Sequence, residues 1–156
     1  MSTVHKVGIV GATGYTGLIL IQYLLRHPRT DIIYLTAHRH AGKQVRDIYP
    51  QLMGDVLPDT FSSFEIDSIP PLDTLFLAVP HGQSHHWLKT LLKCDHIGKI
   101  IDLSADFRVK DPETFKQYYE VDHQSPELLG TIPLGLPELY RDQIRTAKTV
   151  ACPGCY

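Results

Sequence analysis

The chain has 156 residues, of which 43% are apolar and 21% charged, and its formal net charge is −2. This length fits a single domain, and the near-neutral charge gives no electrostatic reason to expect binding to nucleic acid or to an anionic membrane. No apolar run approaches the roughly 18 residues of a transmembrane helix, and three cysteines are too few for a secreted disulfide framework. We therefore expect one domain over residues 1–156, located in the reducing cytoplasm, with no signal or transit segment before it.

The predicted elements alternate between strand and helix. Apolar runs rich in β-branched residues predict strands over 6–10, 32–36, 74–79, 99–103 and 149–151. Helices are predicted over 16–26 and 83–93, and Asp111 followed by Pro112 is typical of a further helix start. Only short elements are expected over 40–72, which contains four prolines. The fold class is therefore α/β, a doubly wound and mostly parallel sheet of the Rossmann-like type.

A glycine-rich turn follows the first predicted strand and opens the first predicted helix. Its glycines have the spacing G-x-x-G-x-x-G. Glycine permits a tight turn and the close approach of a diphosphate, and the N–H groups and dipole of a helix N-terminus favour an anion. We therefore predict dinucleotide binding by Gly11, Thr13, Gly14, Tyr15, Thr16 and Gly17. The alternative is a tight connection between strand and helix that binds no ligand.

The end of the second predicted strand bears on the choice between NAD and NADP. NAD sites usually place an Asp or Glu here, about 20 residues after the turn, to bind the ribose 2′-hydroxyl. In this chain the position holds Thr36, His38 and Arg39, and no acid. Because a basic side chain can pair with a 2′-phosphate, Arg39 and His38 predict an NADP(H) site, with Lys43 as a further candidate and Thr36 as a further cofactor contact. A solvated basic loop is the alternative.

The cysteines permit several interpretations. Cys152 and Cys155 form a C-x-x-C pair, which on its residues alone is a redox disulfide, half of a zinc site, or a nucleophile beside a bystander. A cysteine just past a strand, at the start of a helix, has its thiolate stabilised by backbone N–H groups. Cys94 ends an apolar helix and is expected to be inert packing.

Three histidines lie near the predicted cofactor crevice. His81 follows a strand and is a candidate for binding, whereas His85 and His86 are expected to be solvent-facing or capping residues of the helix over 83–93. None is predicted to be a catalytic base. Their spacing is not that of a metal site, so no metal is predicted.

Six segments occur in a specific order along the chain. They are residues 11–17, 35–36 with 41–43, 78–82, 101–108, 135–139 and 153–156. Together they resemble the N-acetyl-gamma-glutamyl-phosphate reductase family of arginine biosynthesis. Leu-Ser-Ala-Asp-Phe-Arg and Pro-Gly-Cys-Tyr are the specific part, since many dehydrogenases share the glycine turn. The family often has Ser-Arg-Ser where this chain has Ala37-His38-Arg39, which displaces the basic residue by one position.

The resemblance implies NADPH-dependent reduction of N-acetyl-glutamyl 5-phosphate to N-acetyl-glutamate 5-semialdehyde, with release of phosphate. Cys155 would be the nucleophile and form a thioester that accepts the hydride. Pro80 and Ser104 would contact the cofactor, and Arg108 the acyl-phosphate substrate or, alternatively, a loop ion pair. Family members continue into a second domain with the substrate walls, a histidine acid/base and most of the subunit interface. We therefore expect a homo-oligomer for the full-length enzyme, and NADP(H) binding without turnover for 156 residues alone.

Three rival functions remain at the level of sequence. They are aspartate-semialdehyde dehydrogenase, a short-chain reductase or NADP sensor, and a thiol–disulfide oxidoreductase that uses Cys152 and Cys155. Short-chain reductases need Tyr-x-x-x-Lys, and none of the eight tyrosines has a lysine four residues on. This counts against catalysis of the short-chain type but leaves a non-catalytic NADP sensor open.

Overall fold

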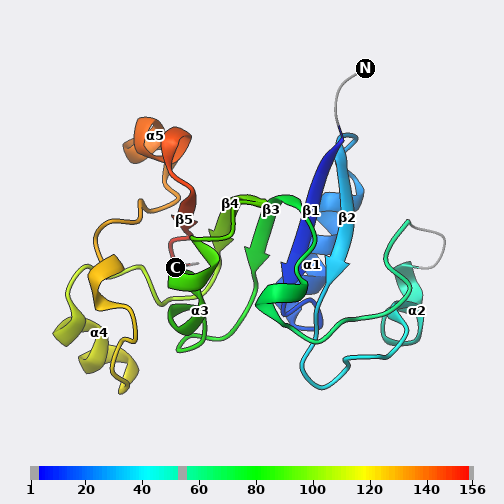
Figure 1. The fold of residues 1–156 in the computed structure, drawn as a ribbon, viewed down its shortest axis with the longest axis horizontal. Helices are drawn as coiled ribbons and strands as arrows, with labels where there is room; N and C mark the ends of the chain where they lie inside the picture. Colours follow the sequence, from blue (N-terminus) through cyan, green and yellow to red (C-terminus); the bar gives the residue numbers. More distant parts are fainter. Residues whose placement is uncertain (1–3, 53–55, 155–156) are drawn as a thin grey trace.

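A computed structural model describes residues 4–52 and 56–154. Its five strands form one parallel sheet in the order β2-β1-β3-β4-β5 (Figure 1). They are β1 (His5–Val10), β2 (Thr30–Leu35), β3 (Leu72–Leu77), β4 (Ile97–Asp102) and β5 (Thr149–Ala151). The chain starts at β1, adds β2 on one side and the remaining strands on the other, so the strand order reverses between β1 and β3. This is the doubly wound α/β fold predicted from the sequence.

The helices that connect the strands agree largely with the predicted ones. They are α1 (Tyr15–Leu25), α2 (Val45–Ile48), α3 (Ser84–Leu91), α4 (Pro112–Tyr119) and α5 (Pro137–Thr146). The predicted N-cap of α4 is confirmed, because the Asp111 carboxylate accepts a hydrogen bond from the Thr114 N–H at 2.8 Å. Of residues 40–72, those at 40–52 and 56–72 are described, and they contain α2 and two short 3₁₀ turns besides the start of β3. Helix α5 was not predicted; none of its residues is fully buried, and the backbone of Tyr140 inside it is non-helical.

The core lies on both faces of the sheet because successive side chains of each strand point to opposite faces. On one face, Ile9 of β1 packs in a cluster with Ile21 of α1. On the other face, Val10 of β1 belongs to a cluster with Leu88 and Leu91 of α3. The strands are therefore covered from both sides, which explains why their sequences are nearly continuous apolar runs.

Parallel strands bring the carboxyl ends of all five strands to one edge of the sheet. Backbone hydrogen bonds continue past the strand ends there: Ala12 N–H to Thr36 O at 2.8 Å, Ala78 N–H to Val10 O at 2.8 Å, Leu103 N–H to Leu77 O at 3.0 Å, and Cys152 N–H to Asp102 O at 2.7 Å. The segments that follow the strands are thus held side by side, at the edge where doubly wound proteins bind their ligands.

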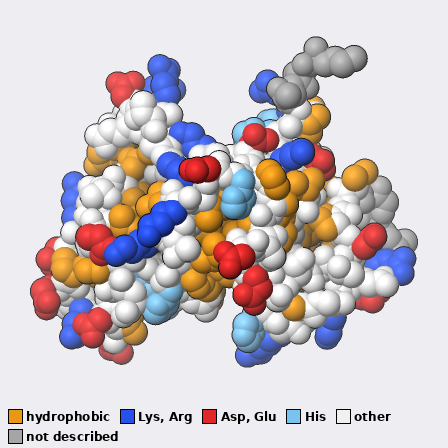
Figure 2. Space-filling model, in the orientation of Figure 1, with side chains coloured by type: hydrophobic (Ala, Val, Ile, Leu, Met, Phe, Trp, Pro, Cys, Tyr) orange, Lys and Arg blue, Asp and Glu red, His pale blue; other side chains and the backbone are white. Residues whose placement is uncertain are grey.

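The surface agrees with the near-neutral composition. Figure 2 shows basic and acidic side chains interspersed on the visible face, with hydrophobic side chains between them. Within the described ranges, no helix has the length and apolar character needed to cross a membrane.

Candidate functional site

The glycine turn connects β1 to α1 at the point where the strand order reverses. Gly11 has φ +81°, in the left-handed region, and a Cβ there would collide with the carbonyl oxygen of Ala78. A Cβ on Gly17 would lie 2.6 Å from the Gly11 carbonyl oxygen, so α1 can approach the turn only because Gly17 has no side chain. Gly14, by contrast, is exposed, and a Cβ there would meet nothing closer than 3.7 Å. Two glycines are needed for packing, and the third leaves open space at the helix start.

The start of α1, beside Gly14, carries backbone N–H groups that can donate hydrogen bonds. Gly14 is the N-cap of α1 and makes no side-chain capping bond. Among the described residues, nothing accepts a hydrogen bond from the N–H groups of Thr13, Tyr15 or Thr16. Unpaired N–H groups at the positive end of a helix dipole form an anion site. The predicted turn residues are thus brought together in a cradle of N–H groups that can bind an anion.

The loop after β2 lies beside this turn. Thr36 is buried and its carbonyl oxygen accepts a hydrogen bond from Ala12 N–H, whereas the side chains of His38 and Arg39 are exposed. Within the described part of the chain, Arg39 makes no ion pair. A carboxylate is absent at this strand end, as the sequence indicated, and the guanidinium is accessible to an anionic ligand.

A cluster of four buried polar side chains lies further along the same edge, at the end of β4. We call it the carboxyl cluster: Ser84, Asp102, Ser104 and Asp106. The Ser84 hydroxyl lies 2.9 Å from Asp102 Oδ2, 3.1 Å from Asp106 Oδ2 and 2.8 Å from Ser104 Oγ. Ser104 Oγ is also 3.0 Å from Asp102 Oδ2. The hydroxyl of Ser104, predicted to contact the cofactor, therefore points into this cluster.

The two carboxyl groups of the cluster have different surroundings. Asp106 accepts hydrogen bonds from Gly82 N–H at 2.6 Å, from His85 N–H at 3.1 Å and from the Ser84 hydroxyl, so it holds the start of α3. For Asp102, burial raises the pKa of the carboxyl group. Asp102 accepts one backbone hydrogen bond, from the Ser104 N–H at 2.9 Å, and its Oδ2 contacts both serine hydroxyls.

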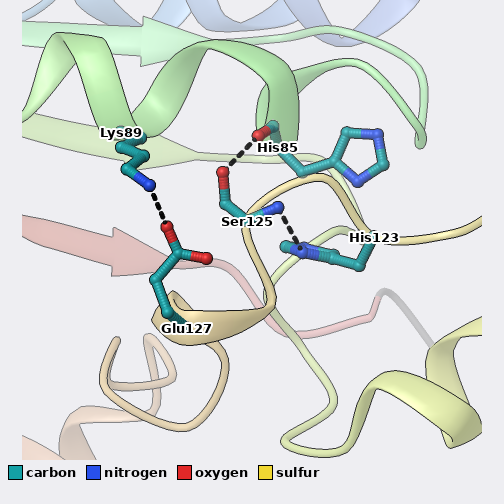
Figure 3. A network of polar contacts seen from close by, with 5 residues as sticks. All are labelled: His85, Lys89, His123, Ser125 and Glu127. Carbon is teal, nitrogen blue, oxygen red and sulfur yellow. Dashed lines mark hydrogen bonds and ion pairs between the residues drawn. The ribbon is translucent and has the colours of Figure 1, made fainter.

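His85 corrects an expectation from the sequence. Its side chain is 1% exposed, so the expectation that it faces solvent is wrong, whereas His86 is exposed. The reason is long-range packing: the segment after α4 folds over the start of α3 and places the His123 ring 4.7 Å from the His85 ring. Ser125 Oγ–H donates to the His85 carbonyl oxygen at 2.8 Å, and Lys89 pairs with Glu127 at 2.6 Å (Figure 3).

His123 is a buried residue that the sequence reasoning missed. Its Nδ1 accepts the Ser125 N–H at 3.1 Å (Figure 3). Its Nε2 lies 3.0 Å from the Asp106 carbonyl oxygen, so the neutral ring with a proton on Nε2 satisfies both bonds. Burial lowers the pKa of both His85 and His123. These rings fasten one loop to α3, whereas His81 and Pro80 remain exposed after β3.

The segment after β5 contains the predicted nucleophile. Cys155 lies outside the described residues. The carbonyl oxygen of Cys152 accepts Arg108 Nε–H at 2.9 Å, and Arg108 Nη2–H donates to the Leu103 carbonyl oxygen at 3.2 Å. Burial raises the pKa of the Cys152 thiol, which keeps it in the less reactive protonated form. Arg108 therefore lies beside the segment that leads to Cys155. In residues 4–52 and 56–154, no cluster of three or more metal-ligating side chains occurs.

A doubly wound sheet with a glycine cradle at its reversal point defines a domain that binds a nicotinamide dinucleotide. The chain belongs to the family described as "Semialdehyde dehydrogenase, NAD binding domain", which matches residues 6–147.

Similar curated proteins confirm the resemblance noted in the sequence. The chain is 43% identical over 151 residues to N-acetyl-gamma-glutamyl-phosphate reductase of Pseudomonas syringae pv. syringae (strain B728a), covering 97% of this chain and 43% of the relative. It is 42% identical over 157 residues to the protein of the same name from Afipia carboxidovorans, covering 100% of this chain and 45% of the relative. The chain thus spans less than half the length of the relatives that it matches.

Solved structures confirm the fold. Aspartate semialdehyde dehydrogenase II from Vibrio cholerae, complexed with ASA, matches with a TM-score of 0.64 at 20% identity, covering 98% of this chain and 42% of that one. Aspartate semialdehyde dehydrogenase with NADP from Candida albicans matches with a TM-score of 0.58 at 19% identity, covering 96% of this chain and 42% of that one.

Proposed function

We propose that this chain is the NADP(H)-binding part of a reductase that converts N-acetyl-glutamyl 5-phosphate to N-acetyl-glutamate 5-semialdehyde. The carrying observation is the combination of the N–H groups of Thr13, Tyr15 and Thr16, which have no acceptor among the described residues, with the exposed Arg39 after β2, where NAD sites carry an acid. The curated relatives that bear the reductase name support the substrate. Homo-oligomerisation of the full-length enzyme and a cytoplasmic location are part of the same proposal.

The chemistry assigned to the chain's own residues begins at Cys155. Its thiolate attacks the acyl carbon, a carbon–sulfur bond forms, and the carbon–oxygen bond to phosphate breaks, so inorganic phosphate leaves. When bound, the reduced nicotinamide supplies a hydride to the thioester carbon. The carbon–sulfur bond then breaks, the aldehyde is released and the thiolate returns. Arg108, beside Cys152, is the candidate to bind an anionic group of the substrate.

Titration of the chain with NADP⁺ and NAD⁺ tests the cofactor half of the proposal. We expect NADP⁺ to bind more tightly, and Arg39→Gln to weaken NADP⁺ about tenfold, through loss of a charge-assisted bond, while NAD⁺ affinity stays the same. The matched control is Arg26→Gln, at the opposite end of α1, which should change neither affinity. Equal losses for both cofactors with Arg39→Gln, or tighter NAD⁺ binding by the wild-type chain, would contradict NADP preference.

The nucleophile is tested in an enzyme completed to the length of its relatives. Cys155→Ser should abolish NADPH oxidation in the presence of the acyl phosphate, whereas Cys152→Ser should retain it. The reverse pattern would refute the assignment of Cys155, and loss of activity in both variants would favour the redox-pair alternative.

A further inference from the structure

One buried tyrosine connects the two halves of the proposed cofactor site. Tyr49 follows α2, and its hydroxyl donates a hydrogen bond to the carbonyl oxygen of Ala12 at 3.0 Å, across 37 residues of sequence. The Tyr49 side chain is buried, and Ala12, in the glycine turn, is fully buried. Burial also raises the pKa of the Tyr49 hydroxyl, which keeps it a hydrogen-bond donor.

The bond to Ala12 fixes the orientation of a peptide group that faces the cradle. A trans peptide is planar, so the carbonyl of Ala12 and the N–H of Thr13 point in opposite directions. Because the Ala12 carbonyl is directed to Tyr49, the Thr13 N–H is directed away from Tyr49. Among the described residues, no group accepts a hydrogen bond from this N–H. The backbone of Ala12 is also held on its other side, because its own N–H donates a hydrogen bond to the Thr36 carbonyl oxygen at 2.8 Å.

The ring of Tyr49 contacts the support of the basic loop. It packs edge-on against Phe61, with 6.0 Å between ring centroids and an interplanar angle of 81°. Phe61 in turn holds the loop after β2 by two backbone bonds, from Gly42 N–H at 2.7 Å and to the Lys43 carbonyl oxygen at 3.0 Å. The loop that carries Arg39 and the glycine turn are thus both anchored at Tyr49.

We propose that Tyr49 is a positioning residue of the cofactor site. Its hydroxyl presents the Thr13 N–H to the diphosphate of the dinucleotide, and its ring holds, through Phe61, the loop that carries Arg39. This inference rests on the proposed function, because it assumes that the glycine turn binds a nicotinamide dinucleotide.

The experiment separates the hydroxyl from the ring. Tyr49→Phe removes only the hydroxyl, so affinity for NADP⁺, NAD⁺ and ADP should fall about fivefold, the effect of one hydrogen bond. Binding of adenosine 2′-monophosphate, which has no diphosphate, should stay the same. Tyr49→Leu also removes the ring, and should in addition lower the ratio of NADP⁺ to NAD⁺ affinity. The matched control is Tyr34→Phe, at a buried tyrosine in the core of the opposite sheet face, which should leave all four affinities unchanged.

The outcomes distinguish the inference from the proposed function. Unchanged NADP⁺ affinity in Tyr49→Phe, with normal binding by the wild type, overturns the inference alone. Equal weakening of the 2′-monophosphate indicates a general loss of structure and also overturns it. A wild-type chain that binds no dinucleotide overturns both. If Tyr49→Phe fails to fold, the amide signal of Thr13 in the wild type decides: it should move on addition of ADP, and a stationary signal overturns the inference.

Discussion

The glycine turn and the carboxyl cluster lie on the same edge of the sheet but are built in opposite ways. The turn acts through its backbone, is exposed at Gly14, Tyr15 and Thr16, and offers N–H groups that have no acceptor among the described residues. The cluster consists of side chains, is buried, and its polar groups contact one another. Unpaired exposed donors can bind a ligand, whereas buried and satisfied groups stabilise the surrounding chain. We therefore assign ligand binding to the glycine turn and structural support of the surrounding loops to the carboxyl cluster.

The carboxyl cluster acts on the site through the loops that it joins. Asp106 holds the start of α3, and the backbone carbonyl oxygen of Asp102 accepts a hydrogen bond from the Cys152 N–H. Arg108, two residues after Asp106, binds the carbonyl of Cys152. The cluster and Arg108 together fix the segment that leads to Cys155. We therefore expect changes in the cluster to alter stability first, and changes on the open surface of the turn to alter cofactor affinity first.

The largest expected effect comes from a substitution at Gly11, where the glycine turn is tightly packed against Ala78. Gly11→Ala introduces a Cβ against the Ala78 carbonyl at φ +81°, and should lower the free energy of unfolding by about 3 kcal/mol or more. Gly42→Ala is the matched control: it has φ +78° but no atom within 4 Å of the added Cβ, so only the backbone conformation is penalised, by about 1 kcal/mol. Urea denaturation measures both values. Similar losses for the two variants would show that the Ala78 contact is unimportant.

A smaller effect distinguishes the two carboxyl groups of the cluster. The two oxygens of Asp106 together accept three hydrogen bonds, and Asp106→Asn replaces one of these oxygens with an NH₂ group. The substitution should lower the free energy of unfolding at pH 7 by about 2 kcal/mol. Asp102→Asn keeps one oxygen for the Ser104 N–H and can donate from its NH₂ group to both serine hydroxyls, so its loss of stability should stay below about 0.5 kcal/mol.

The pH dependence gives a second test of Asp102. Because its pKa is raised in the folded state, the contribution of the wild-type group to stability is fully present below the ordinary pKa of about 3.9. That contribution is lost as pH rises through the raised pKa. Asp102→Asn should remove this loss. A larger penalty for Asp102→Asn than for Asp106→Asn at pH 7 would contradict the expected order of the two carboxyl groups.

The sequence predicts the turn better than the cluster for a physical reason. Gly11, Gly14 and Gly17 act within one local strand–helix connection, so their spacing alone indicates the cradle. Ser84 and Asp102 meet only because β3 and β4 are neighbours in the sheet. The alternation of polar residues at 102, 104 and 106, directly after a buried strand, was a signal for the cluster that sequence reasoning did not use.

Burial of the histidines and the existence of α5 were not predictable from local pattern. His85 is buried by a segment almost forty residues further along the chain, and this packing is a tertiary contact. Helix α5 is interrupted by the non-helical backbone of Tyr140, and none of its residues is fully buried. The strands and the main connecting helices were predicted because each buries an apolar face or run within one short segment. The roles of Arg39 and Cys155 stay predictions.

The smallest effect concerns the histidine contact beside the cluster. Since burial lowers the pKa of His123 in the folded state, the unfolded chain binds protons first as pH falls below the ordinary value of about 6.5, and stability decreases below that pH. The decrease ends below the lowered pKa. His123→Gln cannot bind this proton, so between pH 8 and pH 5 the variant should lose about 1 kcal/mol less than the wild type, although it is less stable at pH 8. The exposed His96→Gln is the control and should keep the wild-type dependence. The test is the free energy of unfolding measured from pH 8 to pH 5. If its pH dependence is the same in His123→Gln as in the wild type, His123 does not cause the loss of stability in acid.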